Sequence, residues 1–209
     1  MGFSKNILLA GLPRVGKTTV VQKILSLAKV RFGGFYTQAV DETARQRDFK
    51  LVTLEGRNRS ISRKHLIQRF ELASLIGVDL ADLRAKGVGA IHGALERCQA
   101  IVVDEIGRHE ALCRELQDAV LAAMDSPLPV LATVPAYGTP FIEALKLRKD
   151  TSVVEVTVAN RVLLPEPIAR HLTGLVRSAA GIAPLPIDTG EEQDLDEGDG
   201  PRLALVARG

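Results

Sequence analysis

The sequence predicts an α/β sandwich built around a largely parallel sheet. Short apolar runs alternate with helix-length amphipathic segments, an order typical of parallel strands that are joined by crossover helices. A length of 209 residues, with 46% hydrophobic and 25% charged residues, is that of an ordinary globular chain with a core of its own. No repeat of 20–50 residues is visible, which argues against a solenoid.

Six strands are expected, because six short runs are apolar and are bounded by turn signals. They cover residues 6–10, 35–40, 49–54, 100–103, 129–134 and 152–158. The first run, NILLA, passes directly into a glycine-containing turn. A charged turn separates the second run from the third, which predicts a β-hairpin added to the parallel sheet.

Six helices are expected between these strands, at residues 20–30, 66–75, 80–97, 110–124, 140–147 and about 166–178. The first has a continuous apolar face that includes Val20, Ile24 and Leu27. Gly87 and Gly89 weaken the third, since glycine is a poor helix former. Prolines at 165 and 167 place the start of the last helix near Glu166.

The charge of the chain is unevenly distributed. Residues 188–209 hold seven acidic and two basic residues, a net charge of −5, and the rest of the chain therefore carries +7. We expect residues 1–178 to form the folded domain and residues 179–209 to form an acidic, flexible tail. The basic domain suits an anionic partner, which could be nucleic acid, a membrane or a phosphate-bearing small molecule.

Several classes of protein are disfavoured by composition. No apolar run reaches 18 residues, and the first residues lack the apolar core of a signal peptide. Cys98 and Cys113 are too few for a disulfide framework and indicate thiols in a reducing cytosol. Aromatic residues make up 4% of the chain, which disfavours stacking on nucleic acid without excluding it. We therefore expect a cytoplasmic protein without a membrane partner, acting as a monomer.

The strongest functional signal is the segment GLPRVGKT at residues 11–18, which fits the pattern G-x-x-x-x-G-K-[ST]. Glycines let the backbone turn its N–H groups toward phosphate oxygens, and the following helix adds its N-terminal dipole. We expect Lys17 to neutralise the β- and γ-phosphates and the Thr18 hydroxyl to ligate Mg²⁺. The predicted nucleotide-binding residues in this segment are Gly11, Leu12, Pro13, Arg14, Val15, Gly16, Lys17, Thr18 and Thr19.

A second signal is the apolar run at residues 100–103, which ends in Asp104 and Glu105. In an open α/β sheet, ligands bind at the carboxyl ends of the strands. Asp104 is therefore a candidate Mg²⁺ ligand, and Glu105 a candidate catalytic group that orients or deprotonates an attacking water.

With both motifs in view, the chain resembles the small P-loop nucleoside-triphosphatases that include the cancer-related nucleoside-triphosphatase. Further matching stretches are GFYTQAV (34–40), FKLVTLEG (49–56), IVVDEIG (101–107), PVLATV (129–134) and RKDTSVVEVTVANRVLLPEPI (148–168). The resemblance implies a RecA-like three-layer fold and Mg²⁺-dependent hydrolysis of ATP, GTP, CTP and UTP to NDP and phosphate. It also implies that Asn160 and Arg161 lie near the base or ribose. Arg14 departs from the family, which usually has glycine there.

Phosphoryl transfer also needs positive charge near the γ-phosphate. The candidates for an arginine finger or its equivalent are Arg45, Arg47, Arg148, Lys149 and Arg161, of which we assign a catalytic role to Arg161.

Two other functions share the phosphate loop. The chain could be a kinase for a nucleoside or nucleotide, although the Asp104–Glu105 pair favours hydrolysis. It could also be a nucleotide-dependent switch whose basic segment at 57–64 or acidic tail engages a protein or RNA partner.

Overall fold

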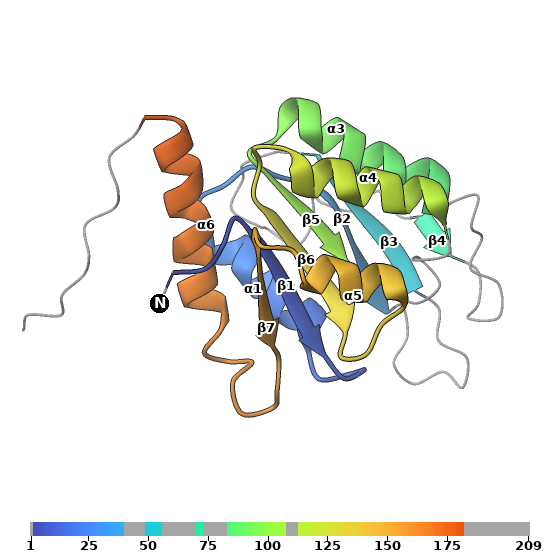
Figure 1. The fold of residues 1–209 in the computed structure, drawn as a ribbon, viewed down its shortest axis with the longest axis horizontal. Coiled ribbons are helices and arrows are strands. Elements are labelled where there is room, and N and C mark those ends of the chain that lie inside the picture. The colour runs from blue at the N-terminus through green and yellow to red at the C-terminus, as the bar shows by residue number, and fades with distance from the viewer. Residues whose placement is uncertain (1, 40–48, 56–69, 73–82, 108–112, 182–209) are drawn as a thin grey trace, which may run out of the picture.

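The computed structural model describes residues 2–39, 49–55, 70–72, 83–107 and 113–181. Its seven strands form one sheet in the order β4-β3-β2-β5-β6-β1-β7 (Figure 1). The strands are β1 (Asn6–Gly11), β2 (Phe32–Ala39), β3 (Phe49–Glu55), β4 (Phe70–Leu72), β5 (Ala100–Asp104), β6 (Val130–Pro135) and β7 (Thr151–Glu155). The five strands from β2 to β7 in this order are parallel, whereas β3 is antiparallel to both of its neighbours.

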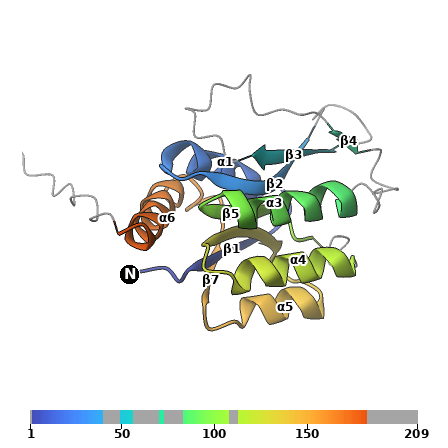
Figure 2. The ribbon, with the colours of Figure 1, turned by 90° about the horizontal axis from the view of Figure 1, so that it is seen from above.

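Helices cover both faces of the sheet, as the view from above shows (Figure 2). The helical elements are α1 (Lys17–Leu27), a π-helical segment η1 (Leu83–Val88) that continues into α3 (Gly89–Arg97), α4 (Arg114–Asp125), α5 (Pro140–Lys146) and α6 (Pro165–Ala179). One core lies between the sheet and α3, α4 and α5, and the other lies between the sheet and α1 and α6. Strands β1 and β5 are buried along their whole length, because each contributes to both cores.

This architecture confirms the predicted α/β class, the mostly parallel sheet and the added antiparallel hairpin strand. The six predicted strands are all present. The helix predicted at 66–75 is wrong where the structure describes it, because residues 70–72 form β4 and pair with β3. Residues 70–72 form backbone hydrogen bonds with β3, a partner that the local sequence does not reveal. This pairing outweighs the helical spacing of the apolar residues at 66–75.

The remaining predicted helices match the described elements within a few residues, although the segment that contains Gly87 begins as a π-helix. Residues 182–209, which hold most of the predicted acidic tail, lie outside the described residues, so the domain boundary at 178 stays a prediction. Among the described helices, none is long and apolar enough to span a membrane.

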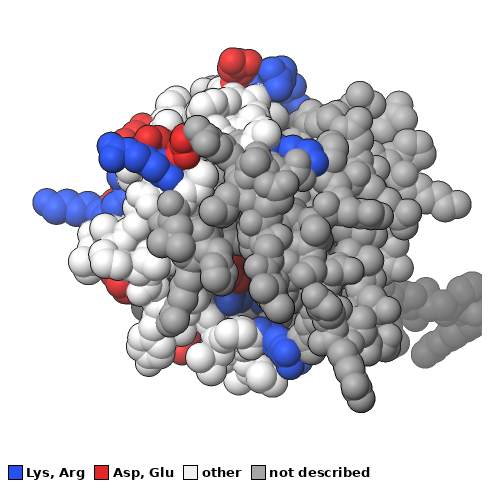
Figure 3. Space-filling model, turned by 90° about the vertical axis from the view of Figure 1, so that its right-hand side faces the viewer, with Lys and Arg blue, Asp and Glu red and all other residues white. Residues whose placement is uncertain are grey.

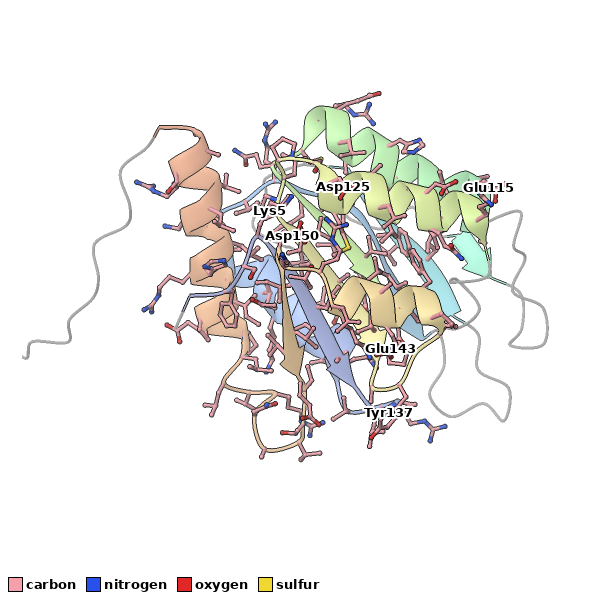
Figure 4. The ribbon with its side chains drawn as sticks, viewed as in Figure 1. Lys5, Glu115, Asp125, Tyr137, Glu143 and Asp150 are labelled. Carbon is pink, nitrogen blue, oxygen red and sulfur yellow. The ribbon has the colours of Figure 1, made fainter. Side chains whose placement is uncertain are left out.

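A polar cluster ties down the edge of the sheet where the strands begin. Arg148, just before β7, forms ion pairs with Asp125 at 2.7 Å and with Asp150 at 2.9 Å. Asn6 donates hydrogen bonds to the Asp150 carboxylate at 3.0 Å and to the Met124 carbonyl at 3.1 Å. Figure 4 shows Asp125 and Asp150 together at this edge, while Tyr137 lies beyond the far end of β6. These contacts join the start of β1 to α4 and β7.

Candidate active site

The loop that follows β1 has the backbone that the glycine-rich motif predicts. Gly16 precedes α1 with φ 105°, a left-handed conformation that costs glycine little, and Arg14 adopts φ 64°. Gly11 packs so closely that an added Cβ would lie 2.9 Å from the Val156 carbonyl oxygen. Arg14 therefore adopts a conformation that glycine favours, at the position where the family resemblance leads us to expect glycine.

Lys17 is buried at the start of α1 and points back into this loop. Its Nζ donates to the carbonyls of Gly11 at 3.0 Å and Leu12 at 3.4 Å. The same Nζ lies 3.4 Å from the Glu105 Oε2 atom, and the Lys17 side chain is 5% exposed against 34% for Glu105. One ammonium group thus joins the glycine-rich loop after β1 to the carboxylate after β5. The structure brings together two residues that are 88 positions apart in the sequence.

Asp104 ends β5 and is fully buried. Its Oδ1 atom accepts a hydrogen bond from the Thr133 hydroxyl, while its Oδ2 atom has no hydrogen-bond partner among the described residues. Burial raises the pKa of Asp104 to about 6, and the hydroxyls of Thr133 and Thr18 oppose this rise. Glu105 also raises the pKa of Asp104, and Lys17 lowers it. A buried carboxylate oxygen without a partner, close to the Thr18 hydroxyl, fits a hard divalent cation such as Mg²⁺.

Thr133 is a site residue that the sequence analysis missed. It lies on β6, between β5 and β1, and is fully buried. Its hydroxyl holds Asp104, and its carbonyl accepts the N–H of Ile106 at 2.9 Å. Thr133 therefore fixes the chain on both sides of Glu105. The signal in the sequence was a lone hydroxyl in the apolar run PVLATV.

Arg161 reaches the phosphate loop from the segment after β7. Its Nη1 atom donates to the Val15 carbonyl at 3.2 Å. The Cδ and Nη1 atoms of Arg161 lie 3.4 and 3.5 Å from the place that a Cβ on Gly16 would occupy. The guanidinium is therefore beside the loop, and its catalytic role stays a prediction. Asn160 lies in the turn after β7. Both polar atoms of its side-chain amide form hydrogen bonds with the backbone of that turn.

Other predicted residues lie elsewhere. Arg148 is wrong as an arginine-finger candidate, because it precedes β7 and belongs to the cluster at the edge where the parallel strands begin, whereas the phosphate loop follows the end of β1. Lys149 adjoins Arg148 at that same edge and is wrong for the same reason. Arg45, Arg47 and the basic segment at 57–64 lie outside the described residues.

On the face in Figure 3, described lysine and arginine side chains are interspersed with acidic ones.

The chain is an α/β protein whose mostly parallel sheet has helices on both faces. A glycine-rich loop joins β1 to α1, and a buried acid lies at the end of β5. Within this class the chain belongs to the NTPase family, whose model matches residues 6–169. It is 37% identical over 155 residues to the nucleoside-triphosphatase THEP1 of Thermotoga petrophila, which covers 74% of this chain and 86% of that protein. It is 36% identical over 179 residues to the nucleoside-triphosphatase THEP1 of Thermofilum pendens, covering 83% of this chain and 98% of that protein.

Solved structures show the same fold. The crystal structure of THEP1 from the hyperthermophile Aquifex aeolicus superposes with a TM-score of 0.63 at 26% identity, covering 78% of this chain and 96% of that chain. The solution structure of a human cancer-related nucleoside triphosphatase superposes with a TM-score of 0.61 at 29% identity, covering 78% of this chain and 94% of that chain.

Proposed function

We propose that this chain is a Mg²⁺-dependent nucleoside-triphosphatase that hydrolyses ATP, GTP, CTP and UTP to the corresponding NDP and phosphate. The names of its relatives support hydrolysis of nucleoside triphosphates. The observation that carries the proposal is the convergence of Lys17, Glu105 and Asp104 at one point, where the phosphate loop meets the end of β5.

Each residue has a role that follows from its place. The loop at residues 11–18 cradles the β- and γ-phosphates with backbone N–H groups, and the N-terminus of α1 adds its dipole. Lys17 exchanges the carbonyls of Gly11 and Leu12 for phosphate oxygens and neutralises their charge. Arg161, held beside Gly16, stabilises the charge that develops on the γ-phosphate.

Asp104 and Thr18 would hold the metal ion, because the unpartnered Oδ2 atom and the nearby hydroxyl are oxygen ligands of the kind that Mg²⁺ prefers. When bound, Mg²⁺ supplies positive charge to the phosphate oxygens. Thr133 keeps the Asp104 carboxylate in a fixed orientation for this task.

Glu105 is the proposed group that orients the attacking water and accepts its proton. It is partly exposed, whereas the adjacent Asp104 is buried, so the two carboxylates face different surroundings and serve different roles. A residue that activates water favours hydrolysis over transfer to another acceptor.

Cys98 and Cys113, both free thiols, support a reducing compartment such as the cytoplasm.

The test measures phosphate release from ATP, GTP, CTP and UTP, with and without Mg²⁺, by the wild type and by Lys17→Ala. We expect release from all four nucleotides that requires Mg²⁺ and is lost in Lys17→Ala. Lys149→Ala is the matched control, because Lys149 is exposed at the opposite edge of the sheet. ATP that is labelled at its γ-phosphate, offered together with a panel of nucleosides, separates hydrolysis from kinase activity. A labelled product other than free phosphate would refute the proposal.

A further inference from the structure

The turn after β7 is held by the side chain of Asn160. Its Oδ1 atom accepts the Thr157 N–H at 2.8 Å, and its Nδ2 atom donates to the Glu155 carbonyl at 2.8 Å. The Asn160 N–H donates in return to the Thr157 hydroxyl at 3.3 Å. The Arg161 N–H closes the turn by donating to the Thr157 carbonyl at 3.0 Å. Both polar atoms of the amide are thus engaged with the backbone of the segment that leads to Arg161.

These bonds orient the Asn160 amide into its own turn. An amide that read a base or a ribose would direct its oxygen or its NH₂ group toward the ligand. Here the oxygen faces the Thr157 N–H, and the NH₂ group faces the end of β7. Direct recognition of nucleotide, which the family resemblance suggests for Asn160, would have to use the second amide hydrogen or the second lone pair of Oδ1.

Arg161 depends on this turn for its position. The residue is exposed, and its guanidinium donates to the Val15 carbonyl and lies beside the place that a Cβ on Gly16 would occupy. A long, exposed arginine side chain has many rotamers, and ordering it costs conformational entropy. Fixing the backbone at residues 157–161 fixes the point from which the side chain reaches the loop.

We propose that Asn160 is a positioning residue that acts through Arg161. This inference rests on the proposed function, because it assigns Arg161 a task at the γ-phosphate. Asn160 shapes the turn, the turn directs Arg161, and Arg161 completes the positive surroundings of the phosphate loop.

A double-mutant cycle tests the inference. We measure kcat and KM for phosphate release from ATP by the wild type, Asn160→Ala, Arg161→Ala and the double variant. A misplacement of about 1 Å can lower a rate ~100-fold, so we expect Asn160→Ala to lower kcat by at least about tenfold with a smaller change in KM. Arg161→Ala should lower kcat at least as much. The double variant should match Arg161→Ala alone, since residues that act as one unit are not additive.

Thr157→Val provides a second perturbation of the same turn, because it removes the hydroxyl that accepts from the Asn160 N–H. It should also lower kcat, and it should have no further effect when Arg161 is already alanine. Arg170→Ala, at an exposed arginine of α6, is the matched control for loss of an arginine and should behave as the wild type does. Thermal unfolding of every variant establishes that it is folded.

If the losses in kcat of the two single variants multiply in the double variant, the inference is overturned in favour of direct nucleotide contact. A wild-type kcat in Asn160→Ala or in Arg161→Ala would overturn it as well. The same cycle is read in the Kd for a non-hydrolysable ATP analogue. A wild type that binds the analogue without releasing phosphate from ATP would refute the proposed function. In that case, a loss of affinity in Asn160→Ala that persists when Arg161 is already alanine would overturn the role given to Asn160.

Discussion

Replacing Asp104 by asparagine should make the protein more stable while it removes activity. Asp104 is fully buried, and burial raises its pKa from 3.8 to about 6. The folded state therefore binds more protons than the unfolded state between these two pH values. The free energy of unfolding falls as the pH rises through this window, and the whole penalty is present above pH 6.

The size of the effect follows from the shift in pKa. A difference of about 2 pKa units at about 1.4 kcal/mol each corresponds to about 3 kcal/mol at pH 8. Asparagine keeps the oxygen that accepts from Thr133 and carries no charge. For a domain of this size, the gain in Tm at pH 8 is about 6–12 °C. At pH 4.5, where folded Asp104 is already protonated, the gain should shrink to roughly 1 kcal/mol.

The measurement is thermal or urea unfolding of the wild type and Asp104→Asn at pH 8 and pH 4.5, in the presence of a chelator. Asp118→Asn is the control, because Asp118 is exposed on α4 and its change should be within about 0.5 kcal/mol. Equal stability of the wild type and Asp104→Asn at pH 8, or a gain that does not decrease at pH 4.5, would refute the reasoning.

Three further substitutions address the site directly. Lys17→Ala should abolish binding of ATP in calorimetry, because the buried ammonium contacts the loop carbonyls that phosphate oxygens would replace; binding at wild-type affinity would contradict this role. Glu105→Gln should keep the affinity for ATP and lower kcat by about 10²–10⁴-fold, as measured by phosphate release. Full turnover would exclude Glu105 as the group that activates water. Thr133→Val should raise the Mg²⁺ concentration that gives half-maximal activity by about 10–100-fold, because Asp104 loses the donor that orients it. An unchanged Mg²⁺ dependence would remove Thr133 from the site.

The order of strands and helices could be predicted from sequence because the buried parallel strands are continuous apolar runs. The sequence also indicated that Lys17 and the acidic pair serve one site, since a glycine-rich loop and a strand-end acid meet at the same edge of a parallel sheet. Strand β4 could not be predicted, because its existence depends on pairing with β3 rather than on its own residues.

The hydrogen-bond partners of Thr133 and Asn160 could not be predicted from the sequence either. A hydroxyl within a buried strand is usually satisfied locally, and only the neighbouring position of β5 gives Thr133 the Asp104 carboxylate as its partner. Asn160 has the residue type of a ligand-binding group, but its hydrogen bonds are decided by how the chain turns after β7. Local propensity does not fix either geometry.

The ion pairs of Arg148 lie at one edge of the sheet, and the phosphate loop lies at the other. Substitutions at sites that are far apart and share no partners change stability nearly additively. Engineering for heat resistance can therefore concentrate on the edge where the strands begin, for example around Asp125, without disturbing turnover. The reverse also holds, since changes at the loop leave the ion pairs at the far edge in place.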